Sequence, residues 1–226
     1  MQKEIPILFN TSMVEAILAG RKSQTRRIIK PQPDDDGLHD HDRFPMSLES
    51  DLSGWWGTVE ETGESKEFRC PYGYGGAPFL KNDLLWVRET WVNVGHNNCQ
   101  DGREDFNTVV YKASENGREW EKNMDGWRWK PNIFLKKDDA RIWLEKTKTK
   151  VQRLYDISEE DAIAEGVEQN IDGSWHDYLE PRRLWQDSAK ASFQSLWIKI
   201  NGEKSWDANP WLWVNHFTVL STTGRP

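Results

Sequence analysis

The sequence predicts an α+β protein in which short strands alternate with a few helices. Apolar runs typical of buried strands occupy residues 5–9 and 84–88, and residues 211–220 alternate in character as a strand does. A long stripe with helical spacing follows Pro181. At 226 residues the chain has room for one elaborated domain or two small ones, and we expect a single domain over residues 1–226.

The composition indicates a globular protein with an aromatic core. Hydrophobic residues make up 36% and charged residues 30%, but 12% are aromatic, including 14 Trp, which a disordered chain would lack. The net charge of -7 argues against a protein that holds nucleic acid through a basic surface spread over the whole molecule. Any contact with phosphate must therefore be local.

The cysteines and the apolar runs indicate a cytoplasmic protein without membrane contact. Cys70 and Cys99 are far apart and form no CxxC pair, so we expect structural thiols rather than a disulfide framework or a cysteine zinc site. No apolar run reaches the roughly 18 to 20 residues that cross a bilayer. The apolar stretch near the first residue is too short for a signal peptide.

In the first half of the chain, a strand at 5–9 leads into a helix. Ser12 and Glu15 form a capping box, which predicts Ser12 as N-cap, and Gly20 supplies the left-handed stop. The residues with helical spacing expected to be buried are Val14, Ile17 and Leu18.

Turn-forming residues predict a long insertion at about 31–78, and a second insertion covers about 93–130. Strands are expected at 84–88 and 108–112, and a long strand or a hairpin at 141–154. Residues 93–106 and 115–129 are interpreted as loops.

The second half predicts two helices and a closing strand. Ser158 caps a short helix with three acids in its first turn, which Gly166 ends. Glu165 lies on its last turn, where a carboxylate is mildly unfavourable; this weakly indicates a positional role, against the alternative of a solvated Glu. The longest helix begins at Pro181 and stops at Asn201-Gly202, with a stripe of Trp185, Ala189, Phe193, Leu196, Trp197 and Ile200.

A basic segment follows Gly20 in an otherwise acidic chain. It contains Arg21, Lys22, Arg26, Arg27 and Lys30, and it forms either a local site for a phosphate or nucleotide, or a solvated basic strand. A Lys desolvated beside Arg residues loses proton affinity and can take the proton of a nearby hydroxyl such as Thr25. Residues three apart lie on opposite faces of a strand, so this pairing needs Lys22 in the turn or a bulge.

Four segments together carry a family resemblance. Residues 17–27 (Ile-Leu-Ala-Gly-Arg-Lys-Ser-Gln-Thr-Arg-Arg) resemble the ASCH-domain signature of helix, Gly, Lys-x-x-Thr and Arg. Residues 83–91, 154–166 and 206–214 resemble the family's second strand, helix and closing strand. The matches are spread over most of the chain outside the two insertions, and in this long form they are similar to phage and prophage members.

The resemblance implies a PUA-like mixed β-barrel with flanking helices and long loop insertions, and binding of nucleic acid or nucleotides. Small bacterial members include amidohydrolases that remove the acyl group from N4-acetylcytidine. By this resemblance Lys22 is the proton acceptor, Thr25 the nucleophile and Glu165 the proton donor to the leaving amine. Arg26 or Arg88 would stabilise the oxyanion.

Further residues are expected to hold the substrate. Glu89 is a competing acid beside Arg88 and Trp91, suited to hold a base by edge and face; the alternative is an Arg–Glu structural pair. The remaining candidates are Arg21 and Arg26 for a phosphate, and Asn209 and Trp211, with Trp206, at the border of the pocket, although packing explains each Trp equally well. We expect no cofactor and no metal, because His39-Asp40-His41-Asp42 lies in a turn-rich insertion where a solvated loop is the better interpretation.

Two main functions follow from these features. The first is hydrolysis of an N4-acylated cytidine or a related modified base through Lys22, Thr25 and Glu165. The alternative is a module that binds RNA or a modified nucleotide without turnover; a phage accessory factor acting through protein contacts ranks last. A nucleoside, a nucleotide, RNA and modified DNA share the same base edge, so the sequence does not choose among them, and it predicts no oligomeric state.

Overall fold

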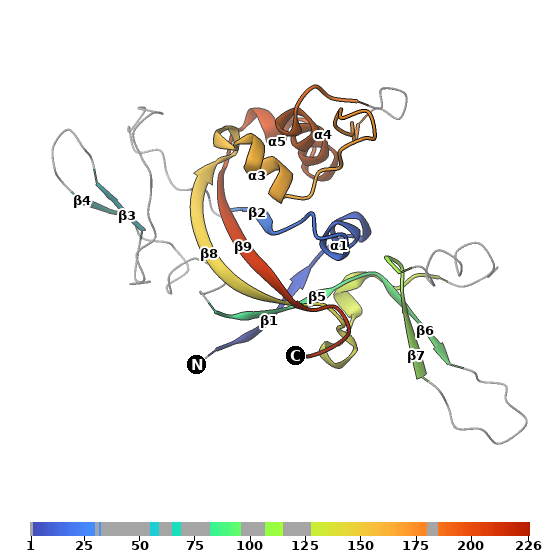
Figure 1. The fold of residues 1–226 in the computed structure, drawn as a ribbon. Helices are drawn as coiled ribbons and strands as arrows, with labels where there is room; N and C mark the ends of the chain where they lie inside the picture. Colours follow the sequence, from blue (N-terminus) through green and yellow to red (C-terminus); the bar gives the residue numbers. More distant parts are fainter. Residues whose placement is uncertain are drawn as a thin grey trace, which may run out of the picture. The chain divides into compact units, whose positions relative to one another are not determined.

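A computed structural model describes residues 2–29, 32, 55–58, 65–68, 82–95, 107–114, 128–179 and 185–226. It confirms an α+β fold (Figure 1). The largest sheet is mixed and has the strand order β1 (Glu4–Leu8), β5 (Leu84–Arg88), β8 (Trp143–Arg153), β9 (Trp211–Ser221) and β2 (Gln24–Ile28). Two further sheets pair β3 (Trp55–Thr58) with β4 (Ser65–Phe68), and β6 (Trp91–Gly95) with β7 (Asn107–Tyr111). In the described residues β1 and β2 are the edges of the largest sheet, so no closed barrel is detected.

The chain divides into two compact units, and β8 and β9 run through both. Unit 1 contains Met1–Gly20, Asp83–Glu145 and Thr218–Pro226, whereas unit 2 contains Arg21–Asn82 and Lys146–Phe217. The expectation of a single domain over residues 1–226 stays a prediction.

Unit 1 is built on a parallel strand pair. β1 pairs with β5 from Glu4↔Leu84 to Leu8↔Arg88, and β5 pairs antiparallel with the start of β8. The predicted strand at 84–88 is confirmed at both ends. The unit also contains α1 (Thr11–Leu18) and two short 3-10 helices, η1 (Asn132–Phe134) and η2 (Lys137–Asp139).

The start of α1 differs from the prediction of Ser12 as N-cap. Asn10 is the N-cap, and its side-chain oxygen accepts a 2.9 Å hydrogen bond from the Met13 backbone N–H. The Ser12 hydroxyl donates to the same oxygen, so it supports the cap instead of forming it. Asn is as good a cap as Ser, and beginning at Thr11 adds hydrogen-bonded residues to a short helix.

The buried face of α1 is only partly as predicted. Val14 and Ile17 are buried, but Leu18 is 37% exposed, and Ala16 is buried in its place. Leu18 is the last helical residue, directly before the chain turns at Gly20, which has the predicted left-handed conformation with φ of 71°.

The expected loop at 93–106 is wrong for its first residues. β6 continues to Gly95, which pairs with Asn107 of β7. Residues 91–94 are rich in Trp and Val, which favour strands, and pairing with β7 extends the strand to Gly95. Residues 96–106 and 115–127 lie outside the described part of the chain.

Unit 2 places three helices beside β2, the end of β8 and the start of β9 (Figure 1). These are α3 (Glu159–Ala164), α4 (Ala189–Asn201) and α5 (Lys204–Asp207), preceded by η3 (Leu154–Asp156). β2 pairs antiparallel with β9 from Gln24↔His216 to Ile28↔Leu212. The apolar core of the unit consists of Leu154, Ile157, Ala162, Val167, Ala189, Phe193, Trp197, Trp206 and Leu212.

Two expected elements in the second half of the chain have different bounds. The segment 141–154 forms one strand at 143–153, not a hairpin. The long helix begins at Ala189 rather than near Pro181, because Ser188 accepts a hydrogen bond from the Ala191 N–H and caps it. Trp185 therefore lies outside the helix and is 48% exposed. Pro181 lies outside the described residues.

Several predictions concern residues that the structure does not describe. These include nearly all of the insertion at 31–78, the His39-Asp40-His41-Asp42 motif, and both cysteines, Cys70 and Cys99. Among the described residues, no helix is long and apolar enough to cross a membrane.

The left-handed turn at Gly20 can be tested by substitution. A Cβ at Gly20 would meet no atom within 4 Å, so Gly20→Ala introduces only backbone strain. We expect a loss of about 1 to 2 kcal/mol in the free energy of unfolding, measured by urea denaturation. Gly20→Asn, whose side chain tolerates this conformation, should lose less than Gly20→Ala; an equal loss would contradict the role of backbone strain.

Candidate functional site

The segment after Gly20 lies against the carboxyl end of α3. Arg21 Nη1 donates to the Gly166 carbonyl at 3.0 Å, Lys22 Nζ to the Glu165 carbonyl at 2.7 Å, and Ser23 N to the Ala164 carbonyl at 2.9 Å. A helix leaves its last carbonyls without helical partners, and cations are favourable at this end. The basic segment therefore completes the end of α3 while α3 fixes the course of the segment.

Lys22 and Glu165 are in direct contact in the interior of unit 2. Lys22 is 3% exposed and Glu165 6%, and Lys22 Nζ lies 2.8 Å from Glu165 Oε2. Burial lowers the pKa of the Lys22 ammonium, although the Glu165 carboxylate acts in the opposite direction. The structure thus joins two of the three predicted catalytic residues, which are 143 residues apart.

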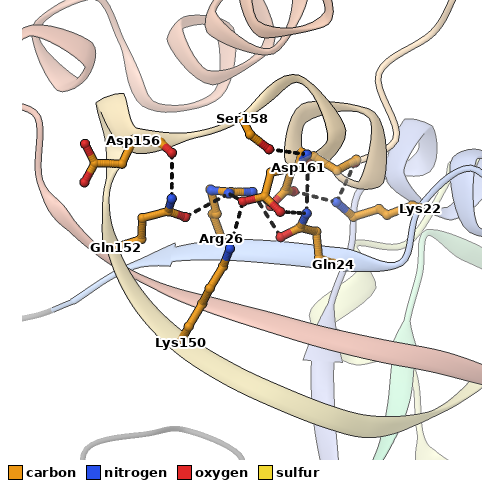
Figure 2. Close-up of polar contacts among 9 residues, drawn as sticks. Lys22, Gln24, Arg26, Lys150, Gln152, Asp156, Ser158 and Asp161 are labelled. Atoms are coloured by element: carbon orange, nitrogen blue, oxygen red, sulfur yellow. Dashed lines mark hydrogen bonds and ion pairs between the residues drawn. The ribbon is translucent and has the colours of Figure 1, made fainter. Parts of the chain in front are cut away.

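Arg26 links Glu165 to a second carboxylate, that of Asp161. Figure 2 shows the contact of Arg26 with Asp161. Its guanidinium contacts Glu165 Oε1 at 3.0 Å and Asp161 Oδ2 at 2.8 Å. Its two terminal nitrogens also donate to the side-chain oxygens of Gln24 and Gln152, both at 3.2 Å. Both terminal nitrogens are therefore in use, and only Nε is buried without a partner in the described part of the chain.

Asp161 contacts several donors besides Arg26. It accepts hydrogen bonds from Gln24 Nε2 at 3.0 Å and from Lys150 Nζ at 2.9 Å. Burial alone would raise the pKa of Asp161, but the hydrogen bonds from Gln24 and Lys150 and the charge of Arg26 lower it to about 2. We call Lys22, Arg26, Lys150, Asp161 and Glu165 the ion cluster; in it, three cations face two carboxylates.

Sequence reasoning missed four of these contacting residues: Gln24, Lys150, Gln152 and Asp161. Signals for them were present. Asp161 and Glu165 are four apart and therefore share a helix face, and Gln24 and Arg26 share a strand face. What the sequence did not reveal is that these two faces meet.

Thr25 lies on the other face of β2. It is 1% exposed and stands between Gln24 and Arg26, whose side chains contact α3, so strand alternation directs its side chain away from them. Its register partner on β9 is Asn215, which is fully buried. Lys22 precedes β2 in an irregular segment, so this alternation does not assign its side chain to a face.

The remaining binding candidates of unit 2 make structural contacts. Asn209 Oδ1 accepts a 2.8 Å hydrogen bond from the Tyr155 N–H, and Asn209 has a φ of 40°. The Arg153 guanidinium packs over the Trp211 ring, 4.3 Å from the ring centre.

Three candidates belong to unit 1. Glu89 is buried and forms a bidentate pair with Arg141, at 2.9 and 2.8 Å, rather than with its neighbour Arg88. Burial raises the pKa of Glu89, and Arg141 opposes this change. Arg88 stacks on Trp86 at 4.7 Å, and Lys130 Nζ lies 4.8 Å from the centre of the Trp91 ring.

Comparisons with known proteins add no identification. Neither family models, nor curated proteins, nor solved structures match this chain. The ASCH resemblance therefore stays a prediction. Among the described residues, no group of three or more His, Cys, Asp and Glu is arranged to hold a metal ion.

The low pKa of Asp161 predicts a specific dependence of stability on pH. Because its pKa falls from 3.8 to about 2 on folding, its contribution to stability is complete above pH 3.8 and is lost as the pH falls towards 2. Asp161→Asn should lower the free energy of unfolding at pH 7 by about 2 kcal/mol. The stability of the Asp161→Asn protein should also fall less than that of the wild type between pH 4 and pH 2.

Urea denaturation across this pH range measures both effects. The matched control is Asp156→Asn, because Asp156 is an exposed carboxylate in the neighbouring η3. This control should keep the wild-type pH dependence. Parallel curves for wild type and Asp161→Asn would show that Asp161 does not have the lowered pKa.

Proposed function

We propose that this chain is an ASCH protein with a PUA-like barrel that hydrolyses the amide of an N4-acylated cytidine or a related modified base. In this proposal Lys22 is the proton acceptor, Thr25 the nucleophile and Glu165 the proton donor. The contact between the buried Lys22 amine and the Glu165 carboxylate, at 2.8 Å, carries the proposal. A Lys with a lowered pKa beside an acid is suited to exchange a proton with it.

Lys22 and Glu165 together accept and return every proton that the reaction moves. The reactive state holds Lys22 as a neutral amine and Glu165 as a carboxylic acid, which has the same net charge as the ion pair. Thr25 Oγ1 attacks the acyl carbon and its proton moves to Lys22; the C–N4 bond then breaks and Glu165 protonates N4. Water next attacks the acyl-Thr25 ester, giving one proton to Glu165, while Lys22 returns its proton to Thr25.

The ion cluster supports the same assignment. Arg26 holds Glu165 Oε1 at 3.0 Å while Lys22 holds Oε2, so the carboxyl group has a defined orientation. The surplus of cations over carboxylates favours an electron-rich ligand. The terminal nitrogens of Arg26 are already in use, which assigns Arg26 to positioning Glu165 rather than to stabilising an oxyanion.

A second function is favoured by the position of Thr25. Its side chain faces away from Gln24 and Arg26, which suits a module that binds RNA, a modified nucleotide or modified DNA without turnover. Both functions place the protein in the cytoplasm with a nucleoside, nucleotide or RNA as partner, and both need the basic segment after Gly20.

Hydrolysis of N4-acetylcytidine by the purified protein tests the first function. We expect release of cytidine and acetate, measured by chromatography. Lys22→Met, Thr25→Val and Glu165→Gln should each lower kcat by about 100-fold or more, because each removes one group of the proton path and changes side-chain size little.

Matched controls come from exposed residues of the same type. Lys199→Met on α4 and Thr218→Val on β9 remove an amine and a hydroxyl far along the chain, and both should keep wild-type activity. Absence of cytidine in all samples contradicts hydrolysis. Binding of N4-acetylcytidine without cytidine release would support the binding module.

A further inference from the structure

Asn215 has a buried polar group in unit 2 that finds no partner in the described part of the chain. The residue lies in the middle of β9 and is 0% exposed. Its Oδ1 accepts a 3.2 Å hydrogen bond from the Thr149 hydroxyl, but its Nδ2 is buried and has no hydrogen-bond partner among the described residues. A buried donor without an acceptor is costly, so Nδ2 is a group that would gain from a hydrogen bond to a ligand.

The orientation of the amide follows from a chain of donors. Lys146, which is 1% exposed, donates from Nζ to Thr149 Oγ1, and a Lys side chain has only hydrogens to offer when charged. The Thr149 hydrogen then goes to Asn215 Oδ1. This arrangement uses the Thr149 hydroxyl in both directions and leaves Nδ2 as the available donor.

Asn215 lies directly opposite Thr25. The two residues are register partners in the β2–β9 pair, and the Phe217 N–H bonds to the Ser23 carbonyl two residues along the ladder. Partners in an antiparallel pair have side chains on the same face, with Cβ atoms about 5 Å apart. The available N–H of Asn215 and the Thr25 hydroxyl therefore belong to one buried polar patch.

We propose that Asn215 Nδ2 donates a hydrogen bond to the acyl carbonyl oxygen of the substrate. The inference rests on the proposed hydrolysis and adds the group that stabilises its oxyanion. When Thr25 Oγ1 bonds to the acyl carbon, the carbonyl π electrons move to oxygen, and Nδ2 stabilises the negative charge. When the C–N4 bond breaks, the carbonyl re-forms and Glu165 protonates N4. Arg26 does not fill this role, because both of its terminal nitrogens already donate to side-chain oxygens of the protein.

Steady-state kinetics with N4-acetylcytidine test the role of Asn215. Asn215→Asp keeps the size of the side chain and removes the donor, and it should lower kcat by about 100- to 1000-fold and raise KM several-fold, because the bound acyl carbonyl also loses its hydrogen bond. Thr149→Val keeps Nδ2 but removes the bond that orients it; because it is a milder change, it should lower kcat by about tenfold. Asn201→Asp, at an exposed position on α4, is the matched control and should keep wild-type kinetics.

Binding measured by calorimetry separates this inference from the proposed function. In the Thr25→Val protein, which should not turn over, Asn215→Asp and Thr149→Val should weaken binding of N4-acetylcytidine. Neither should weaken binding of cytidine, which has no acyl carbonyl. Selective loss of N4-acetylcytidine binding in a protein whose wild type releases no cytidine would support Asn215 and overturn hydrolysis.

Two other outcomes would overturn the role of Asn215. Unchanged kcat in both Asn215→Asp and Thr149→Val, in an active wild type, would overturn the role of Asn215 and leave hydrolysis standing. If the protein binds neither N4-acetylcytidine nor cytidine, both the inference and the proposed function are overturned.

Discussion

The buried ion cluster is the constraint on which the organisation of unit 2 depends. Arg26 lies in β2 and Lys22 in the segment before it, whereas Asp161 lies in α3 and Glu165 at its end. Removing charges from water is expensive, and leaving one of them unpaired costs about 3 to 5 kcal/mol. The strand and the helix must therefore meet in one register, in which both terminal nitrogens of Arg26 find acceptors.

Local signals prepare the two sides of this contact. Gly20 ends α1 in a left-handed conformation, and the basic segment begins at the next residue. Ser158 caps the start of α3, and Gly166 follows its end with a φ of 91°. The apolar core of Ile157, Ala162 and Phe193, among others, holds α3 and α4 together beneath the cluster. Arg26 adds to this contact, because its guanidinium lies 5.7 Å from the centre of the Phe193 ring.

The two faces of β2 have different polar chemistry. On one face, Gln24 and Arg26 belong to an extended network of charges that α3 completes. On the other, Thr25 is opposite Asn215, whose amide is oriented by Thr149 and Lys146. The first face is almost fully satisfied by the protein, as a stabilising network must be. On the second face, Asn215 Nδ2 is buried and has no partner among the described residues, which is uncommon in a folded protein.

The sequence by itself determined the elements whose signals are local. The strand at 84–88, the Ser158 cap and the glycine stops at 20, 166 and 202 follow from apolar runs and from backbone conformations that few residues adopt. Some local features were not predictable from local signals alone. The N-cap of α1 is Asn10 and not the expected Ser12, and pairing with β7 extends β6 into the expected loop.

Only the tertiary structure decided which distant side chains meet. It selected Glu165 as the partner of Lys22, Arg141 as the partner of Glu89, and Asn215 as the residue opposite Thr25. The physical reason is that each of these contacts depends on strand register and on helix docking. Both are set by the summed packing and charge pairing of many residues, and no short segment of the sequence carries that information.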